Sequence, residues 1–535
     1  MPDTFARSEV DGARLIWLLD LTYAGEVLRL STEAVQVSSD DGSIQYIAAI
    51  SGAGWRDEMA GFSTSAPEPS VSLSIVMPPG YSWAAKVAAG HILGMATGEL
   101  SQIRDGDPWE SRVRLLSGRI DAPVYGGDGE PMECSLIASA YDDTSTLIPT
   151  TAVVGAATFP VHHEGHAGKT YPTVIGQPYS HGRTGSKTGT TPGWIVNTTN
   201  RWLLVAGHRV DATQVWVRDL TSSVTVPYWE ALTIVHTQDL LSRTFAYVVL
   251  PNDVTKPSHY NVDGRYMCSW DAGGGMQNRR RTGPLEGAGD VIEWALGQST
   301  LDIDRGRMAA ASDQLNAFKI AGFIDDPEVT AWEWVRANLL PILPVEIRRG
   351  PDGLYPIVHR WTATADDAIE DLDAQRDGIE RDGGAEYNSS RNGEVANEIR
   401  VSYSYDNDTN DYYATAVVHG DPLLGSGADL YRSSHCRRSR LQSATDQPMV
   451  YSERADLVYD PATAARIAHW LAASKAIPSR LITYSAPIRL MYLHPGDVVT
   501  ITDTDLSLVA QLCLVRGVTM EDGPTIRLRL ETIEG

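Results

Sequence analysis

Residues 511–532 read QLCLVRGVTMEDGPTIRLRLET, and they are the clearest indication of the fold class. Two strand-like segments, 511–519 and 525–532, flank the turn sequence Glu521-Asp522-Gly523. In the second segment apolar and polar residues alternate, which is the period of a strand with one buried face. Because Asp-Gly between two such runs is a strong turn signal, this stretch predicts a β-hairpin.

A similar hairpin is predicted much earlier in the chain. Residues 114–120, RLLSGRI, precede the turn sequence Gly126-Gly127-Asp128-Gly129, and an alternating strand follows at 132–137. Residues 512–518, LCLVRGV, hold the corresponding place in the later hairpin. Both ends of the chain also share an order of elements: strands, one short alanine-rich helix, and strands closing in a hairpin. Since any β-hairpin has this general form, the pattern leaves open whether the chain carries two copies of one barrel unit.

The rest of the chain reads as short strands joined by turns, with 47 glycines and 29 prolines. This pattern predicts a mainly β, multidomain protein with α+β insertions. A length of 535 residues suits about three or four domains. We expect a β domain at 1–150, a β-rich connector domain at 151–280, a small α+β domain at 281–392 and a β domain at 393–535.

Helices are expected to be few and short. Asp460 followed by Pro461 is predicted to cap and start one of them, because aspartate accepts from the first free N–H groups and proline has none to give. Other helices are predicted at 82–93, 289–297 and 327–340.

Charge excludes some classes of partner. The chain has 68 acidic and 44 basic residues and a formal net charge of -24. Such a surface repels phosphate, which disfavours nonspecific binding of nucleic acid and of anionic membranes. We find no secretory signal and no run of the roughly 20 apolar residues that a spanning helix needs. We expect synthesis in the cytoplasm.

Four cysteines, Cys134, Cys268, Cys436 and Cys513, lie far apart and form no CxxC pair. This spacing disfavours a zinc or iron–sulfur site and excludes a dense disulfide framework. We expect isolated thiols in core or strand positions.

Several clusters were weighed as sites, each against a structural interpretation. His162-His163-Glu164-Gly165-His166 lacks the HExxH spacing, so a polar loop is favoured over a metal site. Residues 406–411, DNDTND, lack the glycine and glutamate of a calcium loop, which favours a hairpin turn. Gly273-Gly274-Gly275 lacks the pattern of a phosphate-binding loop. No catalytic, cofactor-binding or metal-binding residue is nominated.

Two charged runs are also candidate binding features. Arg279-Arg280-Arg281 is the one basic cluster, and it suits either a solvated loop or a grip on a carboxylate-rich neighbour. The acidic run between Asp366 and Asp373 favours a solvated helix face or loop.

The order of segments resembles the tail hub, or baseplate hub, proteins of tailed bacteriophages and of phage-like gene transfer agents. Four passages carry the resemblance: VRLLSGRIDAP at 113–123, GKTYPTVIG at 168–176, NEIRVSYSY at 397–405 and HPGDVVTI at 494–501. The resemblance implies that the two outer domains are tail-tube-like β-barrel or sandwich domains. Three chains would then present six such domains at the tip of the tail, matching a sixfold tube above and offering threefold symmetry below.

The same resemblance implies a set of partners and no chemistry. These partners are two further copies of the chain, the distal tail protein, the tail tube, the tape measure protein, and a fibre or spike. DNA would pass through the channel without specific binding, and the protein would reside in the virion tail tip. No enzyme activity and no cofactor are expected, since the sequence supports neither a fused hydrolase domain nor clustered cysteines. Two alternatives stay open: a receptor- or carbohydrate-binding tail tip protein, and a cell-wall hydrolase.

Overall fold

The computed structural model places strands in most parts of the chain. The described residues are 14–58, 70–76, 80–125, 130–138, 145–179, 190–220, 229–252, 260–262, 264–270, 273–350, 353–360, 363–383, 386–388, 395–407, 409–421, 424, 427–442, 448–520 and 525–533. The expected fold class, mainly β and multidomain with α+β insertions, is confirmed. The turns expected at 126–129 and 521–523 lie outside the described residues.

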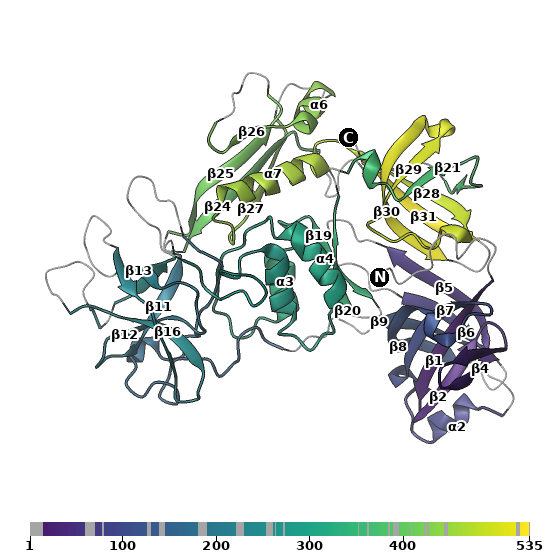
Figure 1. Ribbon diagram of the computed structural model, residues 1–535, viewed down its shortest axis with the longest axis horizontal. Coiled ribbons are helices and arrows are strands. Elements are labelled where there is room, and N and C mark those ends of the chain that lie inside the picture. The colour runs from purple at the N-terminus through teal and green to yellow at the C-terminus, as the bar shows by residue number, and fades with distance from the viewer. Residues whose placement is uncertain are drawn as a thin grey trace.

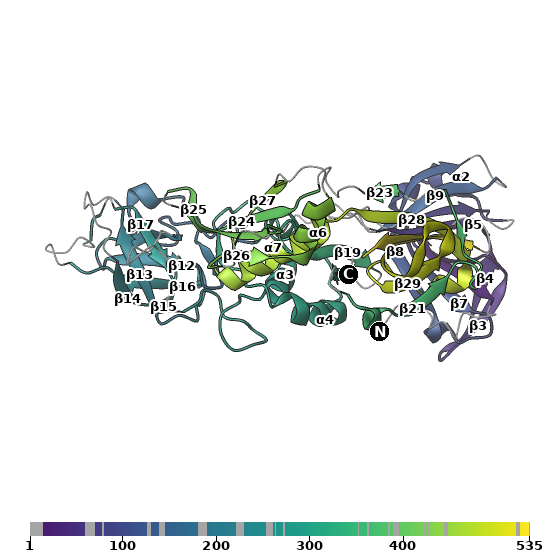
Figure 2. The same cartoon turned by 90° about the horizontal axis from the view of Figure 1, so that it is seen from above.

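The molecule is elongated, and strands from both ends of the sequence meet at one end of it (Figure 1). A separate sheet occupies the opposite end, and most of the helices lie between the two (Figures 1 and 2).

An N-terminal β unit begins the chain. Its strands are β1 (Leu15–Tyr23), β2 (Glu26–Ser31), β3 (Val35–Ser39), β4 (Gly42–Ala48), β5 (Ile50–Glu58), β6 (Ser70–Ile75), β7 (Thr97–Arg104), β8 (Val113–Tyr125) and β9 (Met132–Ala138). Its helical turns are α2 (Trp83–Ala88), η1 (Leu93–Met95) and η2 (Trp109–Ser111). The helix expected at 82–93 starts as predicted, with Ser82 accepting from Ala85 N. It ends early because Gly90 adopts a left-handed conformation with φ of 92°.

A C-terminal β unit is built mostly from the last sixty residues of the chain. Its strands are β21 (Glu370–Asp373), β22 (Glu380–Arg381), β23 (Glu386–Asn388), β28 (Ser479–Pro487), β29 (Val498–Asp503), β30 (Leu508–Met520) and β31 (Thr525–Thr532). Its helical turns are η5 (Ala365–Asp367), η6 (Ile488–Leu490) and η7 (Thr504–Leu506). The predicted hairpin at 511–532 is confirmed as β30 and β31.

The two β units share a strand order. In the first, neighbouring strands run β6-β9-β8-β7, and in the second they run β28-β31-β30-β29, with every pair antiparallel. β8 and β30 are each 13 residues long, and each follows a short 3-10 turn. The first half of each long strand pairs with β7 or β29, and the second half with β9 or β31. The units differ at one edge, since β1 is antiparallel to β7 whereas β21 is parallel to β29.

A middle body fills the space between. A seven-stranded sheet at the far end contains β11 (Thr191–Asn197), β12 (Trp202–Ala206), β13 (Gln214–Asp219), β14 (Glu230–Thr233), β15 (Val235–Gln238), β16 (Thr244–Val249) and β17 (Tyr266–Ser269). Next to it come η3 (Glu164–His166), β10 (Thr173–Ile175), α3 (Ala288–Leu296), α4 (Arg305–Leu315), β18 (Gly322–Ile324), α5 (Ala331–Asn338), β19 (Val345–Gly350) and β20 (Gly353–Val358). The remaining elements are β24 (Glu398–Asp406), β25 (Asp411–His419), β26 (Leu430–Arg432), α6 (Ser434–Gln442), β27 (Val450–Arg454) and α7 (Pro461–Lys475).

The residues expected to form one domain at 393–535 are divided between two bodies. Helix α7 has the predicted start, with Asp460 accepting from Thr463 N, but it packs on β24 and β25. Its Trp470 Nε1 donates to Ile342 O at 3.0 Å, which ties it to the residues after α5. The expected correspondence between α7 and the helix after Ser82 is therefore wrong. By strand order, the place of α2 and η1 is held by η6 and the turn before β29.

The turn HPGD at 494–497 has a conformation that only glycine adopts easily. Gly496 has φ of 98°, and a Cβ there would meet Ile357 Cγ2 at 2.5 Å. Its N–H donates to Val515 O at 2.9 Å, which anchors the turn to β30.

We therefore predict that Gly496→Ala lowers the free energy of unfolding by about 1–3 kcal/mol, because it combines backbone strain with a steric clash. Chemical denaturation measures the change. Gly94→Ala is the matched control, since Gly94 precedes β7 in the N-terminal unit and a Cβ there has its nearest neighbour at 3.9 Å. Equal stability of both variants would contradict this account.

Candidate functional site

The feature that organises the molecule is a joint between the two β units. The second half of β30 pairs with β5, from Gly517 opposite Glu58 to Met520 opposite Trp55. β30 thus changes partners along one edge, from β29 to β5, while β31 covers its other edge. The two units form one continuous sheet, in the order β28-β31-β30-β5-β6-β9-β8-β7.

A bulge marks the point where β30 changes partners. The register to β31 shifts between Val515 and Gly517, and Arg516 is the extra residue. Arg516 Nε lies 3.3 Å from Glu531 Oε2, and these side chains are 9% and 1% exposed. Because a buried charge needs a partner, this pair fixes the bulge in place.

The joint is also a shared hydrophobic core. Val518 and Met520 from β30 belong to the same buried cluster as Val71, Leu73 and Leu136 from the N-terminal unit. Each burial of a large apolar side chain stabilises the fold by about 1.5–3 kcal/mol. Neither unit can therefore separate from the other without exposing its own core.

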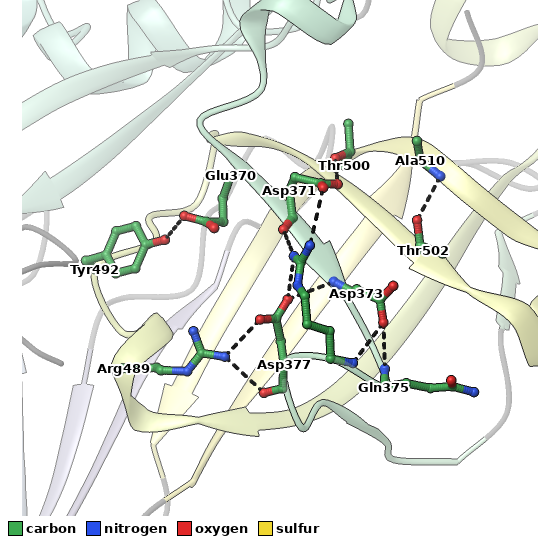
Figure 3. A network of polar contacts seen from close by, with 11 residues as sticks. Glu370, Asp371, Asp373, Gln375, Asp377, Arg489, Tyr492, Thr500, Thr502 and Ala510 are labelled. Atoms are coloured by element: carbon green, nitrogen blue, oxygen red, sulfur yellow. Dashed lines mark hydrogen bonds and ion pairs between the residues drawn. The ribbon is translucent and has the colours of Figure 1, made fainter. Parts of the chain in front are cut away.

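The acidic run of the sequence lies beside this core and carries an internal network (Figure 3). Residues 370–373 form β21, a strand parallel to β29, so the expected helix face or loop is wrong for this part of the run. Thr500 Oγ1 donates to Asp371 Oδ1 at 2.6 Å, and the Tyr492 hydroxyl donates to Glu370. Two carboxylates of the acidic run, Glu370 and Asp371, thus accept hydrogen bonds from side chains of the same chain.

Asp377 is the centre of this network. It accepts from Arg376 Nη2 at 2.9 Å, Arg489 Nη2 at 3.1 Å and the backbone N–H of Asp373 at 2.9 Å (Figure 3). Burial alone would raise the pKa of this carboxyl, but the bonds from Arg376, Asp373 and Arg489 outweigh it and lower the pKa to about 2.

The histidine cluster is structural. His163 accepts from Gly165 N at the start of η3, and His166 is buried and accepts from Ile195 N at 2.8 Å. Burial, with nearby His163 and Lys169, lowers the pKa of His166 to about 4. Within the described ranges, no three histidine, cysteine or acidic side chains gather as a group that could hold a metal ion.

The two other loop motifs also have packing roles. Asp406 and Asp411 lie opposite each other at the end of the β24–β25 hairpin, and Thr409 Oγ1 donates to Asp406 Oδ2 at 3.1 Å. At Gly275, a Cβ would meet Val174 O at 2.3 Å, and its N–H donates to Gly176 O at 2.6 Å. These glycines therefore allow two backbone segments to pass close together.

The basic cluster finds its carboxylates within the chain. Arg281 contacts Asp290 at 3.1 Å and Asp313 at 2.7 Å, and Arg280 pairs with Glu293. All four cysteines are buried and reduced, as expected. Burial raises the pKa of Cys134 and Cys268 to about 12 and that of Cys436 to about 11, so these thiols are poor nucleophiles at neutral pH.

Acidic and aromatic side chains gather in one groove. A cavity of about 530 Å³ is bordered by β24, β25 and the residues that follow β27, and Tyr405, Tyr412, Glu453 and Asp456 line it. The Tyr412 hydroxyl donates to Asp456, and Tyr451 donates to Glu453 Oε2 at 2.6 Å. The rings of Tyr405 and Tyr412 lie 5.1 Å apart. The groove thus places Tyr405 and Tyr412 beside Glu453 and Asp456, which lie more than 40 residues away in the sequence.

Residues 351–512 match the model of a family described as "Putative phage tail protein". The segment contains the acidic network, the sheet of β24 to β27 with its two helices, and β28 and β29, and it ends inside β30. Over this segment the chain is similar to phage tail proteins. The recognition from sequence is confirmed to that level.

Solved structures of tail proteins resemble this chain only weakly. A tail protein from Neisseria meningitidis MC58 is 10% identical, with 97% of this chain and 96% of that chain covered and a TM-score of 0.37. A 43 kDa tail protein of prophage MuSo2 from Shewanella oneidensis is 9% identical, with 97% and 98% covered and a TM-score of 0.37. A chain of a native gene transfer agent virion is 14% identical, with 49% and 80% covered and a TM-score of 0.19. No curated protein matches the sequence. None of the helices in the described part of this chain is long and apolar enough to cross a membrane.

We predict that the two β units of the chain unfold together. Met520→Ala should lower the free energy of unfolding by about 2–5 kcal/mol, because it opens a cavity in the shared core. Hydrogen exchange should show that amide protection falls in β6 and β9 as well as in β31. Val509→Ala is the control, since Val509 lies on the same strand and is 79% exposed. Unchanged protection in β6 would contradict a shared core.

We also predict a specific pH dependence for the acidic network. A carboxyl whose folded pKa lies near 2, below its unfolded value of about 3.9, stabilises the fold above that unfolded value and loses this effect as the pH falls towards 2. Asp377→Asn should therefore cost about 1–3 kcal/mol at pH 7 and progressively less towards pH 3. Denaturation across this range measures the difference, with Asp366→Asn, at an exposed position, as the control. A difference that grows as the pH falls would refute the assignment.

Proposed function

We propose that the chain is a tail hub subunit, a structural virion protein that acts as a homotrimer at the distal end of the tail. The observation that carries the proposal is the repeated strand order of the two β units and their fusion into one sheet. A subunit with two equivalent β units gives six units when three copies form a ring. Such a ring meets a sixfold tube on one side and offers threefold symmetry on the other.

Under this proposal the two β units and the middle body have different roles. The N- and C-terminal β units form the ring, and the middle body, with its seven-stranded sheet and its helices, reaches outward from it. Neighbours of the ring are the tail tube, the distal tail protein and the tape measure protein on one side and a fibre or spike on the other. A net charge of -24 suits a channel that DNA crosses without binding.

We propose no catalytic activity for this subunit. Support comes from the contacts of the clusters that were candidates for chemistry, since His166, Asp406 and Arg281 all bind partners inside the chain. Their polar groups are used for folding, and the four thiols lie in cores.

The test of the proposed function is the state of assembly. We expect mass photometry and native mass spectrometry to detect trimers whose proportion rises with concentration. We expect electron microscopy of assembled tails to place one threefold ring of this chain at the tail tip. A stable monomer at every concentration, or a location along the tube, would overturn the proposal.

A second function is favoured by the groove that Tyr405 and Tyr412 share with Glu453 and Asp456. Aromatic faces next to carboxylates suit binding of a sugar, and a hydrolase would need two such carboxylates. Glycan binding and zymography on cell walls test both alternatives. Loss of binding or cleavage in Tyr412→Ala would favour them over a purely structural role.

A further inference from the structure

Three features of the molecule could form further sites: the aromatic groove, the basic loop at 279–281 and the outer edges of the two β units. The outer edges support the strongest inference, because two equivalent edges, those of β5 and β30, already pair within the chain.

Each strand of the joint between β5 and β30 has a counterpart in the other β unit: β8 corresponds to β30, and β22 with β23 corresponds to β5. At two places the long strands match with an offset of 395 residues and their partners with an offset of 394: Gly118 and Ala138 match Cys513 and Thr532, and Tyr125 and Met132 match Met520 and Ile526. Between these places the register shift lies at Asp121/Val124 in β8 and at Val515/Gly517 in β30. The part of β30 that binds β5 therefore corresponds to 121–125 of β8, with Thr519 in the place of Val124 and Met520 in that of Tyr125.

The strands β22 and β23 together correspond to β5. β5 pairs with β6, with Arg56 opposite Ser70, and β23 pairs with β28, with Glu386 opposite Leu481. Ser70 is in turn opposite Ile137 of β9, and Leu481 is opposite Glu531 of β31, which are equivalent places in the two hairpins. The residues of β5 that contact β30 therefore correspond to 386–388.

Both equivalent edges lack a strand partner among the described residues. β8 pairs with β7 only up to Arg119, and no described strand continues along that edge to Tyr125. β22 and β23 pair only with β28. An unpaired edge of this kind is a template for another strand.

The edge of β8 also carries an exposed apolar patch, which consists of Ile92, Met95 and Val124. These side chains are 69%, 73% and 66% exposed. The turn η1 packs against β8, and Ile120 N donates to Ala96 O at 2.9 Å. At the corresponding place of the C-terminal unit, Leu493 is buried in the shared core, and Thr519, the counterpart of Val124, is half-buried where β30 pairs with β5. In Figure 1, α2, which precedes η1 in the chain, lies at the end of the N-terminal unit away from the C-terminal unit.

We propose that the β22–β23 edge of one copy pairs with residues 121–125 of β8 in the next copy and covers the patch of Ile92, Met95 and Val124. This proposal rests on the proposed function, which supplies the ring, and it names the surfaces that close it. By the correspondence with the joint, Val124 lies opposite Glu386 as Thr519 lies opposite Arg56. Pro123 takes the place of Val518 and has no N–H, so the contact between copies depends more on apolar burial than the joint does.

A disulfide between copies tests this register. Residues directly opposite in antiparallel strands have Cα atoms about 4.5–5.5 Å apart, which suits a disulfide. Val124→Cys combined with Glu386→Cys should give linked species of two and three chains on a non-reducing gel after mild oxidation. The native thiols do not interfere, because all four are buried. Each single variant and the pair Val509→Cys with Glu386→Cys are the controls, and they should give no such ladder.

Charge on the patch is the second test. Met95→Lys with Val124→Lys should raise the concentration at which trimers form by about tenfold or more, since burying an unpaired charge costs more than about 1.4 kcal/mol. The thermal midpoint of the monomer should not fall, because both side chains are exposed. Val509→Lys should leave trimer formation unchanged.

The outcomes separate this inference from the proposed function. If the Val124→Cys/Glu386→Cys variant forms trimers but no disulfide between copies, the assigned edges are wrong. The same holds if the Met95→Lys/Val124→Lys variant forms trimers at the usual concentration. The proposed hub function would survive either result. Absence of any trimer in the unmodified chain overturns both.

Discussion

The structure depends on the backbone hydrogen bonding of one strand. Every N–H and C=O group along β30 needs a partner, and its 13 residues outrun β29 by several positions. β5, from a segment more than 450 residues earlier in the chain, satisfies the remainder. The bulge at Arg516 turns the strand towards that partner, and the buried contact with Glu531 holds the bulge. Without this joint, two half-sheets would each expose an edge and part of a common core.

Local patterns in the sequence predict the parts of this arrangement that are local. The hairpin of β30 and β31 follows from alternation around an Asp-Gly turn, and the start of α7 follows from Asp460 and Pro461. The end of α2 at Ala88 does not follow from composition, because it depends on the left-handed conformation of Gly90. The helix α4 was not predicted, since its sequence, RGRMAAASDQL, has little contrast between its faces.

Long-range partners are not encoded in a periodicity. The apolar face of α7 shows that the helix packs on something, but β24, β25 and the residues near Ile342 are identified only by the fold. The same holds for charges. The acidic run from Asp366 to Asp373 suggested a solvated surface, yet Asp371 accepts from Thr500 inside the chain. Asp377, which lies beyond the run and was not grouped with it, is held by two arginines, one of them 112 residues away. The sequence gave no information on these basic partners.

The joint between the two β units and the two edges that correspond to it differ in a way that physical chemistry explains. The joint inside the chain forms once, during folding, and β5 is a continuous strand of nine residues. Its counterpart is divided into β22 and β23, of two and three residues, and the opposite edge carries Pro123. Short strands and proline are devices that keep exposed edges from pairing indiscriminately. An edge that must stay soluble until assembly needs this protection, whereas an edge that is buried on folding does not. The unequal edges are thus consistent with one joint made within a chain and the weaker one that we propose between chains.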